Sequence, residues 1–186
     1  MICWKCHERL SSLRCASCGA LVPPPAQPEL FGALGLDRRY HVEAEAIDGA
    51  WRRRSKDTHP DRFASASAVE RRMALQWTAT LNEARRVLRD PVARAWYLAT
   101  GKPHPAESGG PKLSPEFLEE IFELRMAADD EPDAVRDTAA KLRARLDADL
   151  EDLFSRWERG EGDLSPVPER LSRLKYVDNL LRELPA

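Results

Sequence analysis

The sequence predicts a mostly α-helical protein in three parts: a small amino-terminal zinc lobe with four cysteines, a four-helix domain, and a carboxy-terminal antiparallel bundle of three helices. Three observations lead to this fold class. Apolar residues recur three or four positions apart along most of the chain, which is the period of an amphipathic helix. Segments rich in proline and glycine divide the chain twice, and all four cysteines lie in the first 18 residues.

The composition suits a globular protein that works through local surfaces. The 186 residues are 42% hydrophobic and 32% charged, enough for one or two modest cores joined by linkers. The net charge of -2, from 29 Lys and Arg against 31 Asp and Glu, excludes a chain-wide attraction to nucleic acid or to an anionic membrane. No apolar run approaches the roughly 18 residues of a membrane span, and the amino terminus is unlike a signal peptide. We therefore expect a cytoplasmic protein without a membrane partner.

The first part, residues 1–22, is predicted to bind a metal. Two C-x-x-C motifs can each offer two thiolates to a tetrahedral ion, and the loop between them is too short to form a core. We expect structural zinc held by all four cysteines. Iron in the same four-sulfur site is the next option, and a redox dithiol is a distant third. The predicted ligands are Cys3, Cys6, Cys15 and Cys18.

A proline-rich spacer over residues 23–28 precedes the four-helix domain, which is predicted to span 29–101. The domain opens with a short helix, because apolar residues crowd between Leu30 and Leu36 with Gly35 near the end. The second helix is predicted from Glu43 to Thr58 and carries four cations in its second half. Cations in the last turns suit the helix dipole, although a solvated charged face explains them equally well.

The second helix is predicted to end at His59, because Pro60 cannot continue a helix and pushes the residue before it out of the helical region. The resulting turn should display His59 and Asp61. An ordinary helix-to-helix loop is the alternative for an isolated His-Pro-Asp. A long third helix follows, with one apolar stripe that can pack against the second. The stripe consists of Met73, Trp77, Leu81, Ala84 and Leu88.

A cap and proline at Asp90-Pro91 predict a fourth short helix through Leu98, and residues 102–112 are predicted to be a second linker. The bundle then spans 113–186. Its first helix, opened by Ser114-Pro115, carries two apolar stripes. Phe117, Ile121, Leu124 and Ala128 suit a bundle core, while Leu118, Phe122 and Met126 form a neighbouring stripe among glutamates. This second stripe is either a partner surface or part of a wide core face.

Two more helices complete the predicted bundle, and their short connections imply antiparallel neighbours. The second helix is predicted from Asp133 until Gly160, and the third follows Ser165-Pro166. The apolar stripe of the second helix consists of Val135, Leu142, Leu146, Leu150, Leu153 and Trp157. In the third helix, Leu171, Leu174, Val177, Leu181 and Leu184 are predicted to point inward, with Tyr176 and Leu180 on an adjacent flank.

The short helix, the basic helix ending in His59-Pro60-Asp61 and the long striped helix together resemble the J-domain of DnaJ-type co-chaperones. The closer resemblance is to the HscB family, the J-proteins of iron-sulfur cluster assembly, and it covers residues 29–186. Some HscB-like proteins also carry an amino-terminal metal lobe with C-W-x-C and C-x-x-C motifs, as this chain does. The segments that resemble the family are 30–36, 59–64, 81–84, 90–98, 117–120 and 123–125.

The resemblance implies that the loop and the basic helix dock on a DnaK-type chaperone, usually HscA, and stimulate its ATPase, so that the chain itself is not an enzyme. Cations would steer the approach to an acidic surface, and the loop would make the short-range contacts. The implied chaperone-binding residues are Arg52, Arg53, Lys56, His59, Pro60, Asp61 and Arg62.

The resemblance also implies that the bundle binds an IscU-type cluster scaffold, at positions that match Leu118, Phe122, Glu123 and Tyr176. The sequence departs from the family pattern at Arg54 and Thr58, where apolar residues are usual, so the basic helix should pack less deeply or bury the Arg54 stem. In the bundle, Glu119 stands where methionine is common, and Met126 and Ala127 interrupt a run that is usually acidic.

A zinc-ribbon nucleic-acid binder is the alternative function. It would place three arginine-rich segments on phosphates, namely 52–56, 71–72 and 85–86. The net charge of -2 argues against a broad phosphate footprint, so we expect no nucleic-acid partner. Monomeric and dimeric states are both compatible with the sequence.

Overall fold

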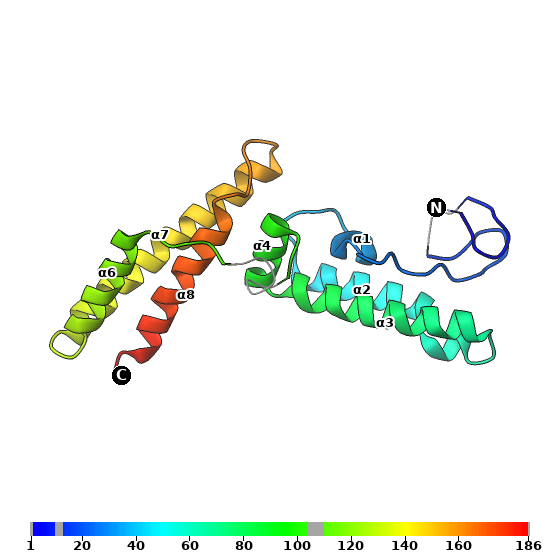
Figure 1. The fold of residues 1–186 in the computed structure, drawn as a ribbon, viewed down its shortest axis with the longest axis horizontal. Coiled ribbons are helices and arrows are strands. Elements are labelled where there is room, and N and C mark those ends of the chain that lie inside the picture. Colours follow the sequence, from blue (N-terminus) through cyan, green and yellow to red (C-terminus); the bar gives the residue numbers. More distant parts are fainter. Residues whose placement is uncertain (1, 10–12, 104–109, 186) are drawn as a thin grey trace. The chain divides into compact units, whose positions relative to one another are not determined.

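The computed structural model describes residues 2–9, 13–103 and 110–185, and it divides into two compact units, Met1–Asp90 and Pro91–Ala186 (Figure 1). Helices dominate both units. In the described ranges, extended pairing is limited to two isolated bridges, Ile2↔Arg9 and Arg14↔Leu21. The predicted mostly α fold class, with four cysteines gathered at the amino end, is therefore confirmed. Of the predicted linker 102–112, residues 104–109 lie outside the described residues.

The first unit is built on a pair of long helices that lie side by side (Figure 1). It contains α1 (Leu30–Leu34), α2 (Ala44–Thr58), the 3-10 helix η1 (Pro60–Phe63) and α3 (Ala68–Arg89). Helix α1 packs on α3, and α3 begins with a capping box in which Ser67 Oγ accepts from the Glu70 amide. The whole predicted stripe of α3 is buried, which confirms that prediction.

Thr58 and Arg54, the two residues of the basic helix that depart from the family pattern, are accommodated by specific packing. Thr58 is 1% exposed, and its hydroxyl donates to the Arg54 carbonyl at 3.0 Å, so the polar atom is satisfied inside the core. Arg54 lies against the turn after α1, where Gly35 has a φ of 72° and a Cβ would collide with the guanidinium. The prediction that this helix packs less deeply is wrong at Thr58, while Arg54 is half-buried against Gly35 as the alternative required.

The second unit contains α4 (Pro91–Thr100), α6 (Pro115–Ala127), α7 (Pro132–Glu158) and α8 (Val167–Glu183). Helices α6, α7 and α8 contact one another, and successive helices run in opposite directions, which confirms the three-helix antiparallel bundle (Figure 1). Ser114 Oγ accepts from the Phe117 amide and caps α6 as expected. Helix α4 packs on α8 and is compact with the bundle, and the predicted domain boundary at residue 101 stays a prediction.

The bundle core differs from the predicted stripes in all three helices, since Leu124 and Ala128 of α6 and Leu142 of α7 are only half-buried. In α7, Phe154 is buried while Leu153 and Trp157 are half-buried, because the inward face follows steps of four residues. In α8, Leu180 is buried and Leu181 is half-buried, the reverse of the prediction. No helix in the described ranges is both long and apolar enough to cross a bilayer.

Candidate functional site

The four predicted metal ligands lie together. The sulfur atoms of Cys3, Cys6, Cys15 and Cys18 are all within 4.8 Å of one another. Across the two motifs, Cys3 Sγ lies 3.7 Å from Cys18 Sγ, and Cys6 Sγ lies 3.5 Å from Cys15 Sγ. Four sulfurs bound tetrahedrally at the usual Zn–S distance of about 2.3 Å would be separated by about 3.8 Å. The cluster therefore fits a tetrahedral ion that joins both motifs.

Both motifs adopt the same turn. The Cys3 amide donates to the Glu8 carbonyl at 2.8 Å, and the Cys15 amide donates to the Ala20 carbonyl at 2.9 Å. The residue after each second cysteine is left-handed, with a φ of 59° at His7 and 69° at Gly19. His7 thus completes the first turn and is not a member of the cluster.

The turns also tune the thiols. The Cys18 amide and further hydrogen bonds lower the pKa of Cys15 to about 6, and the Cys6 amide lowers the pKa of Cys3. The Glu8 amide acts in the same direction on Cys6, but hydrogen bonding with the neighbouring Cys15 and Cys18 sulfurs outweighs it and raises the pKa of Cys6 to about 12. Four sulfurs this close become anionic together only around a cation, which is the chemistry of a metal site.

The His-Pro-Asp turn is displayed as the sequence predicts. His59 ends α2 with a ψ of 131°, the extended value that a following proline favours, and η1 begins at Pro60. The side chains of His59 and Asp61 are 55% and 90% exposed. Thr58 on one side and Phe63 on the other are buried, so the turn projects from two anchored ends.

Short contacts hold the turn closed. His59 Nδ1 lies 3.3 Å from the Asp61 amide and 3.4 Å from Asp61 Oδ2. The Asp61 amide donates to His59 Nδ1, so the histidine side chain closes onto the backbone that follows Pro60. Arg62 donates from Nη1 to the Lys56 carbonyl at 3.1 Å, which places its charge at the negative end of α2.

The basic face of α2 consists of Arg52, Arg53 and Lys56, which are all exposed. Lys56 lies four positions after Arg52 and three after Arg53, so it is a neighbour of both on the helix surface. In the part of the chain that the structure describes, neither Arg53 nor Lys56 forms an ion pair, so both charges are available to a partner. The arginines near the end of α3 do form ion pairs within the chain. Arg85 Nε lies 2.7 Å from Asp48 Oδ1, and Arg89 Nη1 lies 2.9 Å from Asp48 Oδ2.

These pairings weaken the nucleic-acid alternative. The hydrogen bond from Arg85, with the charges of Arg89 and Arg52, lowers the pKa of Asp48, which therefore stays ionised beside the arginines. Arg86 likewise lies 2.6 Å from Glu83. The predicted phosphate contacts at 85–86 are thus largely neutralised by carboxylates within the chain.

The second stripe of α6 faces solvent. Leu118 is 41% and Phe122 63% exposed, and Met126 continues the stripe one turn later. The reading as a wide core face is therefore wrong, because Phe117 and Ile121 occupy the core side of the helix. Glu123 is exposed beside the stripe.

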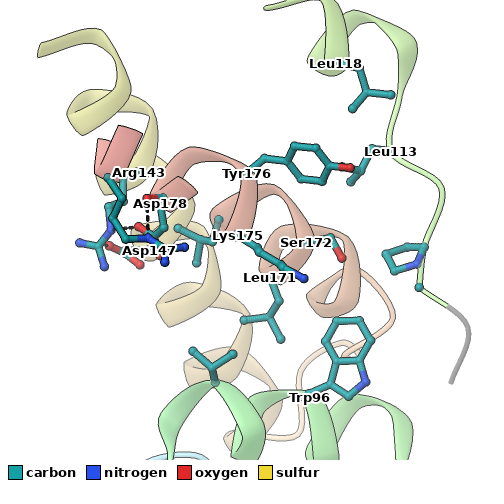
Figure 2. Close-up of a pocket in the computed structure, with 15 residues that line it drawn as sticks. Trp96, Leu113, Leu118, Arg143, Asp147, Leu171, Ser172, Lys175, Tyr176 and Asp178 are labelled. Atoms are coloured by element: carbon teal, nitrogen blue, oxygen red, sulfur yellow. Dashed lines mark hydrogen bonds and ion pairs between the residues drawn. The ribbon is translucent and has the colours of Figure 1, made fainter. Parts of the chain in front are cut away.

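A cavity of about 570 Å³ lies at one end of this surface, between α4, α6 and α8. Leu118 and Tyr176 both line it, and Figure 2 shows the Tyr176 ring pointing toward Leu113 and Leu171 pointing toward Trp96. Phe122 and Glu123 lie outside the cavity, one turn along α6. Sequence reasoning missed the contribution of Trp96, because only the packing of α4 on α8 brings it there.

Charged side chains line the part of the cavity that α7 and α8 form. Arg143 of α7 lies 2.7 Å from Asp178 of α8, which raises the pKa of the arginine and links the two helices (Figure 2). Tyr176 is positioned from behind by the buried ring of Phe117, with an edge-on centroid distance of 6.4 Å. The surface thus combines exposed apolar side chains with a charged margin.

Comparison with known proteins agrees with this architecture. A family model described as the HSCB C-terminal oligomerisation domain matches residues 113–185. The crystal structure of the human co-chaperone protein HscB has a TM-score of 0.70 at 21% identity, covering 98% of this chain and 96% of that one. That coverage extends the likeness in fold into the cysteine lobe. The chaperone HscB from Vibrio cholerae has a TM-score of 0.57 at 26% identity, covering 83% and 94%.

Curated relatives are similar over most of both chains. The co-chaperone protein HscB homologue of Bordetella petrii is 35% identical over 170 residues, which are 87% of this chain and 96% of that protein. The Bordetella pertussis homologue is 37% identical over 168 residues, with 87% and 96% covered. The Azoarcus sp. homologue is 32% identical, with 85% and 92% covered. The chain therefore belongs to the HscB family of co-chaperones.

Proposed function

We propose that this chain binds an IscU-type iron-sulfur cluster scaffold and delivers it to a DnaK- or HscA-type chaperone, whose ATPase it stimulates. The observation that carries the proposal is the turn at the end of α2, where His59 and Asp61 are exposed between buried anchors. Because the turn is held by its own contacts, it is preorganised for a partner, which lowers the entropic cost of docking.

Steering and switching are separate roles in this proposal. Arg52, Arg53 and Lys56 raise the rate of encounter with an acidic chaperone surface. His59 and Asp61 then make the short-range contacts that favour the hydrolysing state of the chaperone, and Pro60 fixes the backbone between them. Arg62, folded back on α2, extends the positive surface to the turn.

The scaffold occupies the other unit in this proposal. Leu118 and Phe122 supply the apolar contact area, and Tyr176 offers a ring with a polar hydroxyl at the margin. Glu123 beside them would orient a cationic group of the scaffold. No residue of this set takes part in the bundle core, so a partner can cover it without disturbing the fold.

The cysteine lobe is proposed to hold structural zinc. Four thiolates in a closed tetrahedral set are typical of zinc, and iron suits the same donors. Neither ion would catalyse a reaction there, because four protein ligands leave no open position. Metal analysis of the purified protein distinguishes them. We expect the protein to work in the cytoplasm, where an ATP-dependent chaperone has its nucleotide.

The test is the ATPase rate of a DnaK-type chaperone with the purified chain added. Wild-type protein should stimulate the rate, and His59→Gln should abolish stimulation while the circular dichroism spectrum is unchanged. The matched control is His41→Gln, an exposed histidine outside the turn, which should stimulate like the wild type. Full stimulation by His59→Gln would refute the role of the turn.

A further inference from the structure

We propose that the second knuckle of the cysteine lobe, residues 13–22, supports the His-Pro-Asp turn, with Arg14 as the positioning residue. The test of this inference by ATPase stimulation rests on the proposed function, whereas its test by hydrogen–deuterium exchange does not. No residue of the lobe was predicted to touch the turn, and the proline-rich spacer at 23–28 suggested that the two were separate.

The contact that carries the inference is between Arg14 and Phe63. The guanidinium carbon of Arg14 lies 5.4 Å from the centroid of the Phe63 ring, within the range of a cation–π interaction. Phe63 is the last residue of η1 and is 3% exposed, so it anchors the carboxy-terminal end of the turn. Arg14 covers this anchor from the side of the lobe.

The knuckle itself fixes the position of Arg14. Its Nε donates to the Gly19 carbonyl at 3.3 Å, and its backbone pairs with Leu21 in an isolated bridge. Arg14 directly precedes the ligand Cys15, and Gly19 directly follows the ligand Cys18. An ion held by the cysteines would therefore hold both ends of the segment that presents Arg14.

The same knuckle is tied to the first unit at a second point. Leu21 and Val22 are buried, and the Val22 carbonyl accepts a buried hydrogen bond of 2.6 Å from Trp77 Nε1 on α3. The Val22 amide donates back to the Leu13 carbonyl at 2.9 Å. The knuckle thus contacts both α3 and η1, and these two elements also contact each other. It therefore restrains the turn between α2 and η1 from a separate segment of the chain.

Loss of the Arg14 contact should loosen the turn without removing its functional groups. His59 and Asp61 remain in place, so maximal ATPase stimulation should persist. The concentration of co-chaperone needed for half-maximal stimulation should rise about two- to fivefold, the factor expected for one partly exposed cation–π contact. An unchanged maximal stimulation with a higher half-maximal concentration distinguishes a positioning residue from a residue that contacts the chaperone in the stimulating complex.

The experiment compares Arg14→Ala with Arg9→Ala in the metal-loaded full-length protein. Arg9 lies in the same lobe, where its backbone pairs with Ile2 beside the first C-x-x-C motif. It is exposed and has no described contact with the turn, so its removal is the matched charge control. Hydrogen–deuterium exchange of amides 61–64 in the free protein should speed up in Arg14→Ala and stay at the wild-type rate in Arg9→Ala. Arg14→Lys, which keeps a cation, should be intermediate. Removing the metal from the wild type with a chelator should speed up exchange at the same amides.

Equal exchange in Arg14→Ala and Arg9→Ala would overturn the inference, and so would wild-type protection of the turn after metal removal. These outcomes are independent of the chaperone assay. If the wild type fails to stimulate any DnaK-type ATPase while Arg14→Ala still exchanges faster, the proposed function fails and the support of the turn stands. If the wild type stimulates and Arg14→Ala matches it in both assays, the inference alone fails.

Discussion

Truncating the exposed stripe of α6 tests whether the second unit has its own partner surface. Leu118 and Phe122 are 41% and 63% exposed, so a scaffold can cover only those fractions of their side chains. Full burial of such a side chain contributes about 1.5–3 kcal/mol, which scales to about 1.5–3 kcal/mol for the two exposed portions together. Leu118→Ala with Phe122→Ala should therefore raise the Kd for an IscU-type scaffold about 10- to 150-fold.

The assay is isothermal titration of the scaffold into each variant. The matched control is Val69→Ala with Leu75→Ala, which removes similar apolar area from exposed positions of α3 and should leave the Kd unchanged. Stimulation of the chaperone in the absence of scaffold should also persist in the α6 variant, since the His-Pro-Asp turn lies in the other unit. A Kd within about threefold of the wild type would show that the stripe is not the binding surface.

Three further changes test the packing of the first unit. Gly35→Ala should destabilise the protein by at least about 1 kcal/mol in denaturant unfolding, because φ is positive there and the new Cβ meets the Arg54 guanidinium; an unchanged midpoint would contradict that contact. Thr58→Val keeps the buried volume and loses one hydrogen bond to a helical carbonyl, so its unfolding free energy should change by less than about 1.5 kcal/mol. Asp48→Asn should be less stable than the wild type at pH 7. Because Arg85 lowers the pKa of Asp48 in the fold, this difference should shrink as pH falls below about 4, and a constant difference would refute the role of the carboxylate charge.

The features that depend on local chemistry were predictable from the sequence. Pro60 dictates an extended residue before it, so the end of α2 and the exposure of His59 followed from one residue type. The cysteine cluster followed from spacing, because each C-x-x-C fits a single turn. The buried stripe of α3 followed from periodicity, since one helix face packs on α1 and α2.

The features that depend on packing between segments were not predictable. Arg54 is tolerated because Gly35, far away in sequence, leaves space for its guanidinium. Trp96 lines the cavity only because α4 packs on α8. The contact between Arg14 and Phe63 joins residues 49 positions apart, and no periodic pattern in the sequence predicts it.

The reversed burial of Leu180 and Leu181 relative to the prediction has a related cause. Both are apolar and adjacent in α8, so the hydrophobic pattern identifies the helix but leaves its rotation to the partners it packs against. In α6, by contrast, the glutamates between the two stripes mark the outer side of the helix, and the predicted assignment of Phe117 to the core and Leu118 to the second stripe is confirmed.

The measurement that bears most directly on the central claim is the ATPase rate of a DnaK-type chaperone with this chain, taken with and without an IscU-type scaffold. A co-chaperone that delivers a scaffold should stimulate alone and stimulate more strongly when the scaffold is present, because one chain then engages both partners. The His59→Gln variant should show neither effect, and the Leu118→Ala, Phe122→Ala variant should lose only the added effect of the scaffold. Stimulation that ignores the scaffold would contradict delivery, and no stimulation at all would contradict the co-chaperone mechanism.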